Sequence, residues 1–455
     1  MQKVKPALLK GFDQEFLPHE QLQFNALVDL IRQTFELYGF LPIETPSAEL
    51  REVLTSKGAV EKEIYGLSRL AAAPGEEGSG RGALRFDLTV PLARYVAMRE
   101  HQLAFPFRRY QIQRVWRGEN PQANKGRFRE FYQCDIDIIG KGKLSSLAEA
   151  EIPSVIYSLF RKMDIGSFLI RINNRKILRG LLQNFAVPEE KAAAVLRTLD
   201  KIEKVDKAAI LSELAREGVD GGAANDLHGL LSDKRETDDT LRQLRELNSV
   251  RSEVFEQGLK ELEFIVSAIR DFGVPDSAFC VDLAVVRGLD YYTGTIYETS
   301  LSEHPELGSI CSGGRYDDLA SYFTNTKLPG VGISIGLSRL FAKLKEMNLL
   351  KTPARTPAQV LVTTMDQQFL SRYLSWANRL RGEQINTELY LETAKLGEQL
   401  SYAEKKGFRV AVIAGSREME QGVVQVKDLA AKTTTNCTDN EFMGTVKSIL
   451  AGRGN

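Results

Sequence analysis

The feature that most limits the possible folds is a long helical stretch between two strand-rich regions. From about 175 to 272 the chain is charge-rich and helix-patterned, as in "EKAAAVLRTLDKIEKVDKAAILSELAREG". Short alternating segments separated by turn residues lie on both sides of it, which is typical of antiparallel strands. We therefore expect one antiparallel sheet whose two halves are separated in sequence by a helical insertion. The fold class is α+β, with helices flanking that sheet.

The strands expected before the insertion begin with a short one in "FLPIETP", after an amphipathic helix from 20 to 38 that Gly39 ends. "EIYGLSRL" and "ALRFDLTV" both alternate, so they predict a hairpin with its tip at 75–82. "FRRYQIQRVWRG" and "RFREFYQCDIDIIG" predict two more strands, joined by "ENPQANKG". After the insertion, strands are expected in "AFCVDLAVVRGLDYYTGTIYE", "GSICSGGRYDDL" and "PGVGISIG".

The C-terminal region predicts a separate domain. "VLVTT", "INTELYL" and "RVAVIAG" alternate with helical segments to give a βαβαβ pattern, followed by "GVVQVKDL". That is a compact α/β unit of about 100 residues. The expected division is therefore a first domain over 1–345 (with the insertion at about 175–272), a linker over 346–358, and an α/β domain over 359–455.

Several classes of protein are excluded by what the chain lacks. It has no run of about 18 uncharged apolar residues and no N-terminal apolar signal region, so we expect a cytoplasmic protein without a membrane span. The four cysteines are far apart, which favours reduced thiols over a zinc site or disulfides. The four histidines lie away from every motif, which argues against Ser-His-Asp chemistry. No metal site is expected.

Nucleotide-binding loops of the common kinds are also absent. No P-loop sequence occurs, and "GVGISIG" has the wrong glycine spacing and the wrong surroundings for a dinucleotide-binding turn. The net charge is zero, so a polyanionic partner would have to be bound by local basic patches.

A basic patch of that kind lies between Phe107 and Arg129, where arginines and lysines greatly outnumber acids. Arg117 shares a strand face with Val115, and a guanidinium on a half-buried face needs an anionic partner. For Arg108 and Arg109, a solvated strand face remains an equal alternative.

A polar row is expected on the next strand. In "FYQCDIDII", Gln133, Asp135 and Asp137 share one face, opposite the apolar residues between them. Such a row predicts a site for cations or hydrogen-bond donors, with a solvent-facing ladder as the alternative. Asp87 and Thr89 in "DLT" add a carboxylate and a hydroxyl from a neighbouring segment.

The segment "VVRGLDYYTGTIYE" (285–298) alternates like a strand but contains Arg287, Gly288, Tyr291 and Tyr292. The two tyrosines would face opposite sides of such a strand, so both cannot be core residues. With no histidine or metal cluster available, chemistry must come from positioning and charge neutralisation, as in phosphoryl or nucleotidyl transfer.

These motifs resemble those of histidyl-tRNA synthetase, a class II aminoacyl-tRNA synthetase, over nearly the whole chain. "GFLPIETP", "VWRGENPQANKGRFREFYQCDIDIIG" and "GVGISIGLSRL" are similar to the three class II motifs. "RGLDYY" and "SGGRYDDL" resemble the two signatures of the histidine-specific enzymes. The resemblance implies a homodimer, joined through the first motif, that uses ATP with Mg²⁺ as co-substrate and no tightly bound cofactor. It would activate histidine to histidyl-adenylate and transfer it to tRNA(His).

The resemblance also implies three sets of site residues. Those expected to bind histidine are Asp87, Leu88, Thr89, Arg117, Gln133, Asp137, Arg287, Tyr291 and Tyr292. Those expected to bind ATP are Arg117, Glu119 and Arg339, and those expected to meet the 5′ end of the tRNA are Gln122, Lys125 and Arg127.

Individual roles follow from the family. Asp87 and Thr89 would bind the α-ammonium group, while Asp137 and Tyr292 would contact the imidazole nitrogens. Arg287 would lie at the α-phosphate, in a role that a metal ion fills in related enzymes.

Arg117 would bind the α-phosphate and the carboxylate, and Arg287 and Arg117 are the expected catalytic residues. Glu119 would contact the adenine amino group, and Arg339 the γ-phosphate or the adenine face. The insertion would contact the acceptor stem, and residues 359–455 the anticodon.

Departures from the family pattern exist, and two alternatives remain. "KGFDQEFLP" follows the usual N-terminal signature only loosely. Ser338 stands before Arg339 where the family usually has glutamate, which leaves the geometry of the third motif open. A catalytically silent paralogue that senses histidine or tRNA is one alternative. A ligase forming amides other than aminoacyl-tRNA is the other, against which the α/β domain argues.

Overall fold

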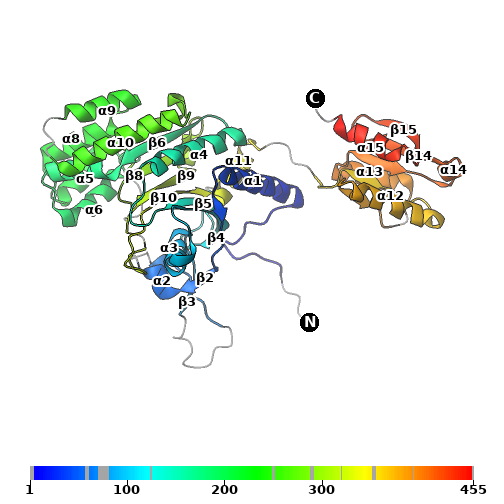
Figure 1. Cartoon of the computed structure of the whole chain (residues 1–455), viewed down its shortest axis with the longest axis horizontal. Coiled ribbons are helices and arrows are strands. Elements are labelled where there is room, and N and C mark those ends of the chain that lie inside the picture. Colours follow the sequence, from blue (N-terminus) through cyan, green and yellow to red (C-terminus); the bar gives the residue numbers. More distant parts are fainter. Residues whose placement is uncertain are drawn as a thin grey trace. The chain divides into compact units, whose positions relative to one another are not determined.

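The computed structural model describes residues 5–56, 61–69, 81–122, 126–247, 252–286, 292–318, 320–350, 355–392 and 394–452. The chain forms two compact units, which are Met1–Gln14 with Leu27–Leu349, and Glu15–Ala26 with Leu350–Asn455. Figure 1 shows the elements of both units. No helix in the described part of the chain is long and apolar enough to cross a membrane.

The first unit is built on an eight-stranded sheet in the order β1-β4-β5-β10-β9-β8-β6-β7. Its strands are β1 Leu41–Pro42, β4 Phe107–Trp116, β5 Glu130–Ile139, β6 Phe168–Asn174, β7 Phe279–Val281, β8 Thr295–Leu301, β9 Cys311–Tyr316 and β10 Gly330–Gly336. The pairs β1–β4 and β6–β7 are parallel and the others are antiparallel. A separate two-stranded ladder pairs β2 Ala48–Leu50 with β3 Gly82–Leu84. The predicted α+β class with an antiparallel-rich sheet is confirmed.

Helices accompany this sheet along the chain. They are α1 Pro18–Leu37, α2 Arg51–Thr55, α3 Thr89–Arg99, α4 Leu147–Met163 and α11 Leu337–Glu346, with 3₁₀ turns at Glu61–Glu63, Glu100–Gln102, Asp276–Ala278 and Pro305–Leu307. One face of β5 and β10 is apolar, with buried Cys134, Ile136 and Ile138 paired to Ile335, Ile333 and Val331. Arg108 shares that face of β4 and forms an ion pair of 2.8 Å with Glu151 of α4, so α4 lies on this side of the sheet.

The helical insertion (Arg175–Asp271) lies between β6 and β7 in sequence. It contains α5 Arg175–Asn184, α6 Glu189–Leu199, α7 Lys207–Arg216, α8 Gly221–Ser232, α9 Thr237–Glu246 and α10 Glu253–Asp271. These helices gather beside the β6 and β8 side of the sheet in Figure 1. The helical pattern predicted for this stretch is confirmed.

The second unit contains a five-stranded sheet in the order β12-β11-β13-β14-β15. Its elements are β11 Val360–Val362, a 3₁₀ turn at Gln367–Phe369, α12 Leu370–Gly382, β12 Thr387–Leu389, α13 Leu396–Lys406, β13 Val410–Ile413, α14 Ser416–Glu420, β14 Val423–Asp428, β15 Thr433–Thr438 and α15 Phe442–Ala451. The predicted βαβαβ pattern is confirmed, since β11 pairs in parallel with both β12 and β13. Trp376 and Tyr373 of α12 are fully buried in its core.

Two local predictions need correction. The strand predicted through Thr89 is wrong, because β3 ends at Leu84 and α3 begins at Thr89. The strand predicted from 285 to 298 is also wrong at its start, since β8 begins only at Thr295. The hairpin tip predicted at 75–82 lies outside the described residues up to 80.

All four cysteines are free thiols, three of them buried. This agrees with the prediction of reduced, packed cysteines.

Candidate functional site

The face of the sheet opposite the apolar one carries a buried row of polar residues. On β5 it consists of Gln133, Asp135 and Asp137, all less than a tenth exposed. The neighbouring strands add polar or small residues at the paired positions, which are Gln113, Gln111 and Arg109 on β4 and Gly336, Ser334 and Gly332 on β10. The alternative of a solvent-facing ladder is therefore wrong, because these carboxylates are enclosed.

Asp137 is the most constrained member of the row. Nη2 of Arg109 lies 2.5 Å from its Oδ2, and the hydroxyl of Tyr316 donates a hydrogen bond of 2.7 Å to its Oδ1. Burial raises the pKa of Asp137 to about 6, while Arg109 and Tyr316 act in the opposite direction. An added Cβ at Gly332 would lie 2.2 Å from Oδ1 of Asp137, so only glycine leaves room for that carboxylate.

Arg109 is fully buried, which contradicts the reading of this residue as part of a solvated strand face. A fully buried guanidinium requires compensating negative charge. Asp137 supplies it, and Arg109 also lowers the pKa values of Asp87 and Asp135 electrostatically. These four charged groups therefore belong to one site.

Asp87 contributes a carboxylate from the start of α3. Its Oδ1 accepts a hydrogen bond of 3.1 Å from the amide of Val90 in the first turn of the helix. Its Oδ2 is buried and has no hydrogen-bond partner among the described residues. Burial raises the pKa of Asp87 to about 6, while the hydrogen bond from Val90 and the charges of Arg117 and Arg109 act in the opposite direction.

The two other residues of "DLT" differ in exposure. The side chain of Leu88 is fully buried in the core, so only its backbone is available to a ligand. Thr89 is half-buried at the first position of α3.

Arg117 directly follows β4, and its side chain is 30% exposed, consistent with the predicted half-buried position. Its Nε donates a hydrogen bond of 2.9 Å to the carbonyl of Phe86, and its guanidinium lies over the ring of Phe131. Glu119 is 3.9 Å away and partly exposed. The backbone of Phe86, the ring of Phe131 and the carboxylate of Glu119 thus hold Arg117 in place.

Gln133 and Tyr292 complete the part of the row that the structure describes. Nε2 of Gln133 donates to Oγ of Ser334 at 2.7 Å, while its Oε1 is buried without a partner among the described residues. Tyr292 packs against the cluster that contains Tyr316, and its ring would lie 3.1 Å from a Cβ added at Gly314. Asp87, Gln133 and Asp135 therefore each keep one buried acceptor oxygen without a partner among the described residues.

Arg339 lies in the first turn of α11. Its guanidinium donates a hydrogen bond to the carbonyl of Leu307, and its side chain would lie 3.1 Å from a Cβ added at Gly126. The preceding Ser338 is fully buried and accepts a 2.9 Å hydrogen bond from the amide of Tyr132 on β5. The serine that departs from the family pattern therefore joins α11 to β5.

The predicted tRNA-contacting residues lie on the connection between β4 and β5. Gln122 and Arg127 are both exposed and form a two-way backbone bridge with hydrogen bonds of 3.0 Å. Lys125 lies outside the described residues, as do Arg287 and Tyr291. Among the residues that the structure does describe, no group of three metal-ligating side chains was found.

Arg109 and Tyr316 were not predicted as site residues, whereas Asp135 was expected in the polar row but was given no role of its own. Tyr316 belongs to "SGGRYDDL", which the sequence did mark as a signature, so that motif carried the available signal. Asp135 is 2% exposed with an unpartnered Oδ1, and burial raises its pKa to about 7.

Comparison with known proteins agrees with this geometry. A family model described as histidyl-tRNA synthetase matches residues 13–340, and one described as anticodon binding domain matches residues 359–449. A histidine–tRNA ligase of Xanthomonas axonopodis pv. citri is 46% identical, over 98% of this chain and 96% of its own. A histidine–tRNA ligase of Clostridium tetani is 44% identical, over 98% of this chain and 99% of its own.

Solved structures show the same likeness. The crystal structure of histidyl-tRNA synthetase from Nostoc sp. PCC 7120 superposes with a TM-score of 0.88 at 40% identity, covering 98% of this chain and all of that one. A Bacillus halodurans protein titled as an ATP phosphoribosyltransferase regulatory subunit/histidyl-tRNA synthetase has a TM-score of 0.73 at 20% identity, covering 88% of this chain and 97% of that one. That second likeness shows the shared fold alone.

Proposed function

Because this chain belongs to the histidyl-tRNA synthetase family, we propose that the polar face of its larger sheet binds histidine and ATP and joins them. The chain is a histidine–tRNA ligase, an enzyme that activates histidine with ATP and transfers it to tRNA. The observation that supports the proposed site best is the buried group of Arg109, Asp137 and Tyr316 on one sheet face, with buried Asp87 interacting electrostatically with Arg109 and Asp137.

Histidine would bind with its α-ammonium group at Asp87 and Thr89. The unpartnered Oδ2 of Asp87 supports this, because a buried carboxylate oxygen without a partner is costly and a bound ammonium group would supply one. The backbone of Leu88 would lie alongside.

The imidazole ring would lie between Asp137 and Tyr292, with Gln133 and Tyr291 completing the pocket. Hydrogen bonds to both ring nitrogens reject other side chains, because a wrong ligand leaves buried polar groups unpaired. The free Oε1 of Gln133 and the enclosed position of Asp137 support this arrangement.

ATP would bind with Arg117 at the α-phosphate, Glu119 at the adenine amino group and Arg339 at the γ-phosphate or the adenine face. Magnesium–ATP enters as a substrate. A carboxylate oxygen of histidine attacks the α-phosphorus, the bond from that phosphorus to the bridging oxygen breaks, and pyrophosphate leaves. Arg117 and Arg287 would stabilise the charge on the phosphate, so the protein acts by positioning and electrostatics.

In the second step a terminal ribose hydroxyl of the tRNA attacks the carbonyl carbon of the adenylate, and AMP leaves. Gln122, Lys125 and Arg127 would meet the 5′ end of tRNA(His), which the exposure of Gln122 and Arg127 supports. The helical insertion would contact the acceptor stem.

Residues 1–345 would form the catalytic domain, 346–358 the linker and 359–455 the anticodon-binding domain. The enzyme would be a cytoplasmic homodimer without a membrane partner. Support for the dimer comes from β1, which ends the sheet and carries Leu41 at 60% exposure, while Leu37 at the end of α1 is 71% exposed. An apolar sheet edge of this kind favours pairing with a second copy.

The test is histidine-dependent exchange of labelled pyrophosphate into ATP, followed by charging of purified tRNA(His). Pyrophosphate exchange without charging of the tRNA would show that histidine is activated and that binding of the tRNA or transfer to it fails. Absence of both would favour the alternative of a catalytically silent paralogue that senses histidine or tRNA.

A further inference from the structure

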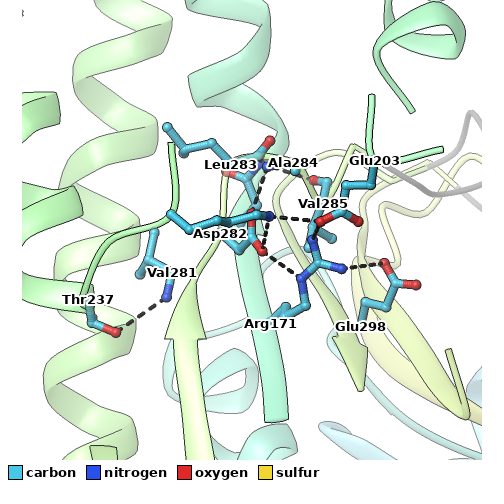
Figure 2. Close-up of polar contacts among 11 residues, drawn as sticks. Arg171, Glu203, Thr237, Val281, Asp282, Leu283, Ala284, Val285 and Glu298 are labelled. Carbon is cyan, nitrogen blue, oxygen red and sulfur yellow. Dashed lines mark hydrogen bonds and ion pairs between the residues drawn. The ribbon is translucent and has the colours of Figure 1, made fainter. Parts of the chain in front are cut away.

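A cluster of charged residues joins the helical insertion to the sheet. Figure 2 shows Arg171 of β6 between Asp282, Glu203 and Glu298, with Asp282 directly following β7. Nε of Arg171 lies 2.6 Å from Asp282 and Nη2 lies 2.6 Å from Glu203, while Glu298 is 4.0 Å away. Lys234 of the insertion completes the cluster, 2.7 Å from Asp282 and 2.8 Å from Glu203.

The cluster bridges segments that are far apart in sequence. Glu203 lies between α6 and α7 and Lys234 between α8 and α9, so both belong to connections within the insertion. Arg171 and Asp282 belong to the sheet side and are largely buried, at 14% and 7% side-chain exposure. Burial alone would raise the pKa of Asp282, but Arg171 and Lys234 lower it below its ordinary value. Asp282 is therefore ionised at neutral pH, and removing one partner would leave a buried charge uncompensated.

The segment that this cluster holds is residues 282–286, which is not part of a strand. Oδ1 of Asp282 accepts a hydrogen bond of 2.9 Å from the amide of Ala284. Nδ2 of Asn173, on β6, donates to the carbonyls of Leu283 at 3.1 Å and Val285 at 3.0 Å.

Arg175 of α5 extends this support by one residue, because its Nη1 donates to the carbonyl of Val286 at 3.0 Å. Side chains thus replace the ladder hydrogen bonds that a strand would have supplied. The next residue in the chain is Arg287, which the proposed function places at the α-phosphate.

We propose that Lys234 and Glu203 of the insertion are positioning residues for histidine activation, acting through Asp282 on residues 282–286. The inference rests on the proposed role of Arg287. It assigns to the insertion a part in a step that takes place without tRNA. A displacement of about 1 Å in a catalytic group can reduce a rate about 100-fold, so two loop residues far from the substrate can matter.

The test compares two lysine variants in tRNA-free pyrophosphate exchange. Lys234→Met removes the contact with Asp282. Lys201→Met is the matched control, because Lys201 is also about half exposed on the insertion and forms a 2.7 Å ion pair with Glu213. We expect Lys234→Met to lower the kcat of exchange about 10-fold, with the KM values for histidine and ATP within about two-fold. Lys201→Met should stay within about two-fold in all three.

If the ion pair of Lys234 served only stability, Lys234→Met and Lys201→Met would have similar kcat values. The two variants would then differ only in thermal unfolding temperature. Equal kcat values would therefore overturn the proposal. Lys234→Arg should restore most of the rate, and Glu203→Gln should reproduce part of the loss. The double variant Lys234→Met/Asp282→Asn should lose less kcat than the product of the two single-variant fold-decreases. A decrease equal to that product would mean that Lys234 does not act through Asp282.

Arg287→Ala separates this inference from the proposed function. If that variant keeps full exchange, the role of Arg287 fails. If it loses exchange while Lys234→Met matches its control, only the positioning role fails.

Discussion

The hydroxyl of Tyr316 donates a 2.7 Å hydrogen bond to Oδ1 of Asp137, although 179 positions separate the two residues in the chain. Both are buried, and Arg109 lies at the other carboxylate oxygen. Asp137 is therefore held in a fixed orientation before any substrate arrives. Such a preorganised acceptor is what selective binding of a small polar ring requires.

Tyr316→Phe should weaken histidine binding. A hydrogen bond to a charged group contributes about 1.5–3 kcal/mol, so the KM for histidine should rise roughly 10-fold or more, with a smaller change in kcat. The tyrosine also helps to lower the pKa of Asp137 from the value that burial alone would give, and with it present that pKa is about 6. Without it the pKa should rise, and kcat/KM for histidine should begin to fall at a higher pH as the solution is acidified. Comparison of the two pH profiles cancels the titration of the substrate itself, and superimposable profiles would contradict this role.

Gly332→Ala should abolish most histidine activation. The new Cβ would lie 2.2 Å from Asp137 Oδ1 and 2.3 Å from the carbonyl of Ile136, so the carboxylate or β5 must move. Overpacking of this kind costs about 1–3 kcal/mol in stability, and the displaced carboxylate should raise the KM for histidine by a further large factor. Gly336→Ala on the same strand is the control, because its nearest neighbour would be 4.0 Å away. Equal KM values for the two variants would show that the space at Gly332 is not needed for binding.

Arg287→Ala should lower the rate of adenylate formation by two to three decades, about 3–4 kcal/mol, which is the usual effect of losing one preorganised charge donor. Pyrophosphate exchange at saturating histidine and ATP measures it. An unchanged rate would remove Arg287 from the mechanism.

Asp135→Asn should stabilise the protein, and more so at high pH. The pKa of Asp135 is about 7, raised mainly by burial from an ordinary value of 3.8. The folded state therefore holds this proton more tightly than the unfolded state, and the folded protein loses stability as the pH rises from about 4 to 7. Because one pKa unit corresponds to about 1.4 kcal/mol, the variant should gain about 2 kcal/mol or more at pH 8 and progressively less toward pH 5. Thermal unfolding at pH 5 and pH 8 measures the gain in stability, with Asp226→Asn at an exposed position as the control. A loss of stability in Asp135→Asn at pH 8 would contradict the raised pKa of Asp135.

Much of the site could be predicted because alternation along a strand is a local property. The common face of Gln133, Asp135 and Asp137 follows from their spacing alone, and the structure confirms it. The pairing of Arg109 with Asp137 could not be predicted in the same way. It depends on the register between β4 and β5, which brings together residues 28 positions apart and which alternation within either strand does not specify.

The two wrong strand boundaries have a common cause. The carboxylate of Asp87 accepts a hydrogen bond from the amide of Val90 in the first turn of α3, where the helix replaces the alternation that "ALRFDLTV" suggested. Asn173 and Arg175 hold the backbone of 283–286 with their side chains, so this apolar run is buried without being a strand. In both places, side-chain hydrogen bonds from polar residues override an apolar pattern that favours a strand.

The uninterrupted ladder between β4 and β5, from Phe107–Ile139 to Trp116–Glu130, also limits how such a chain can vary in length. Asp137 and Arg117 sit toward opposite ends of it, and each paired residue adds about 3.4 Å between them. An insertion of one residue in either strand would turn half of the polar row toward α4. Evolutionary gain or loss of residues here should consequently be confined to the connection between the two strands, where length can change without altering the spacing between Asp137 and Arg117.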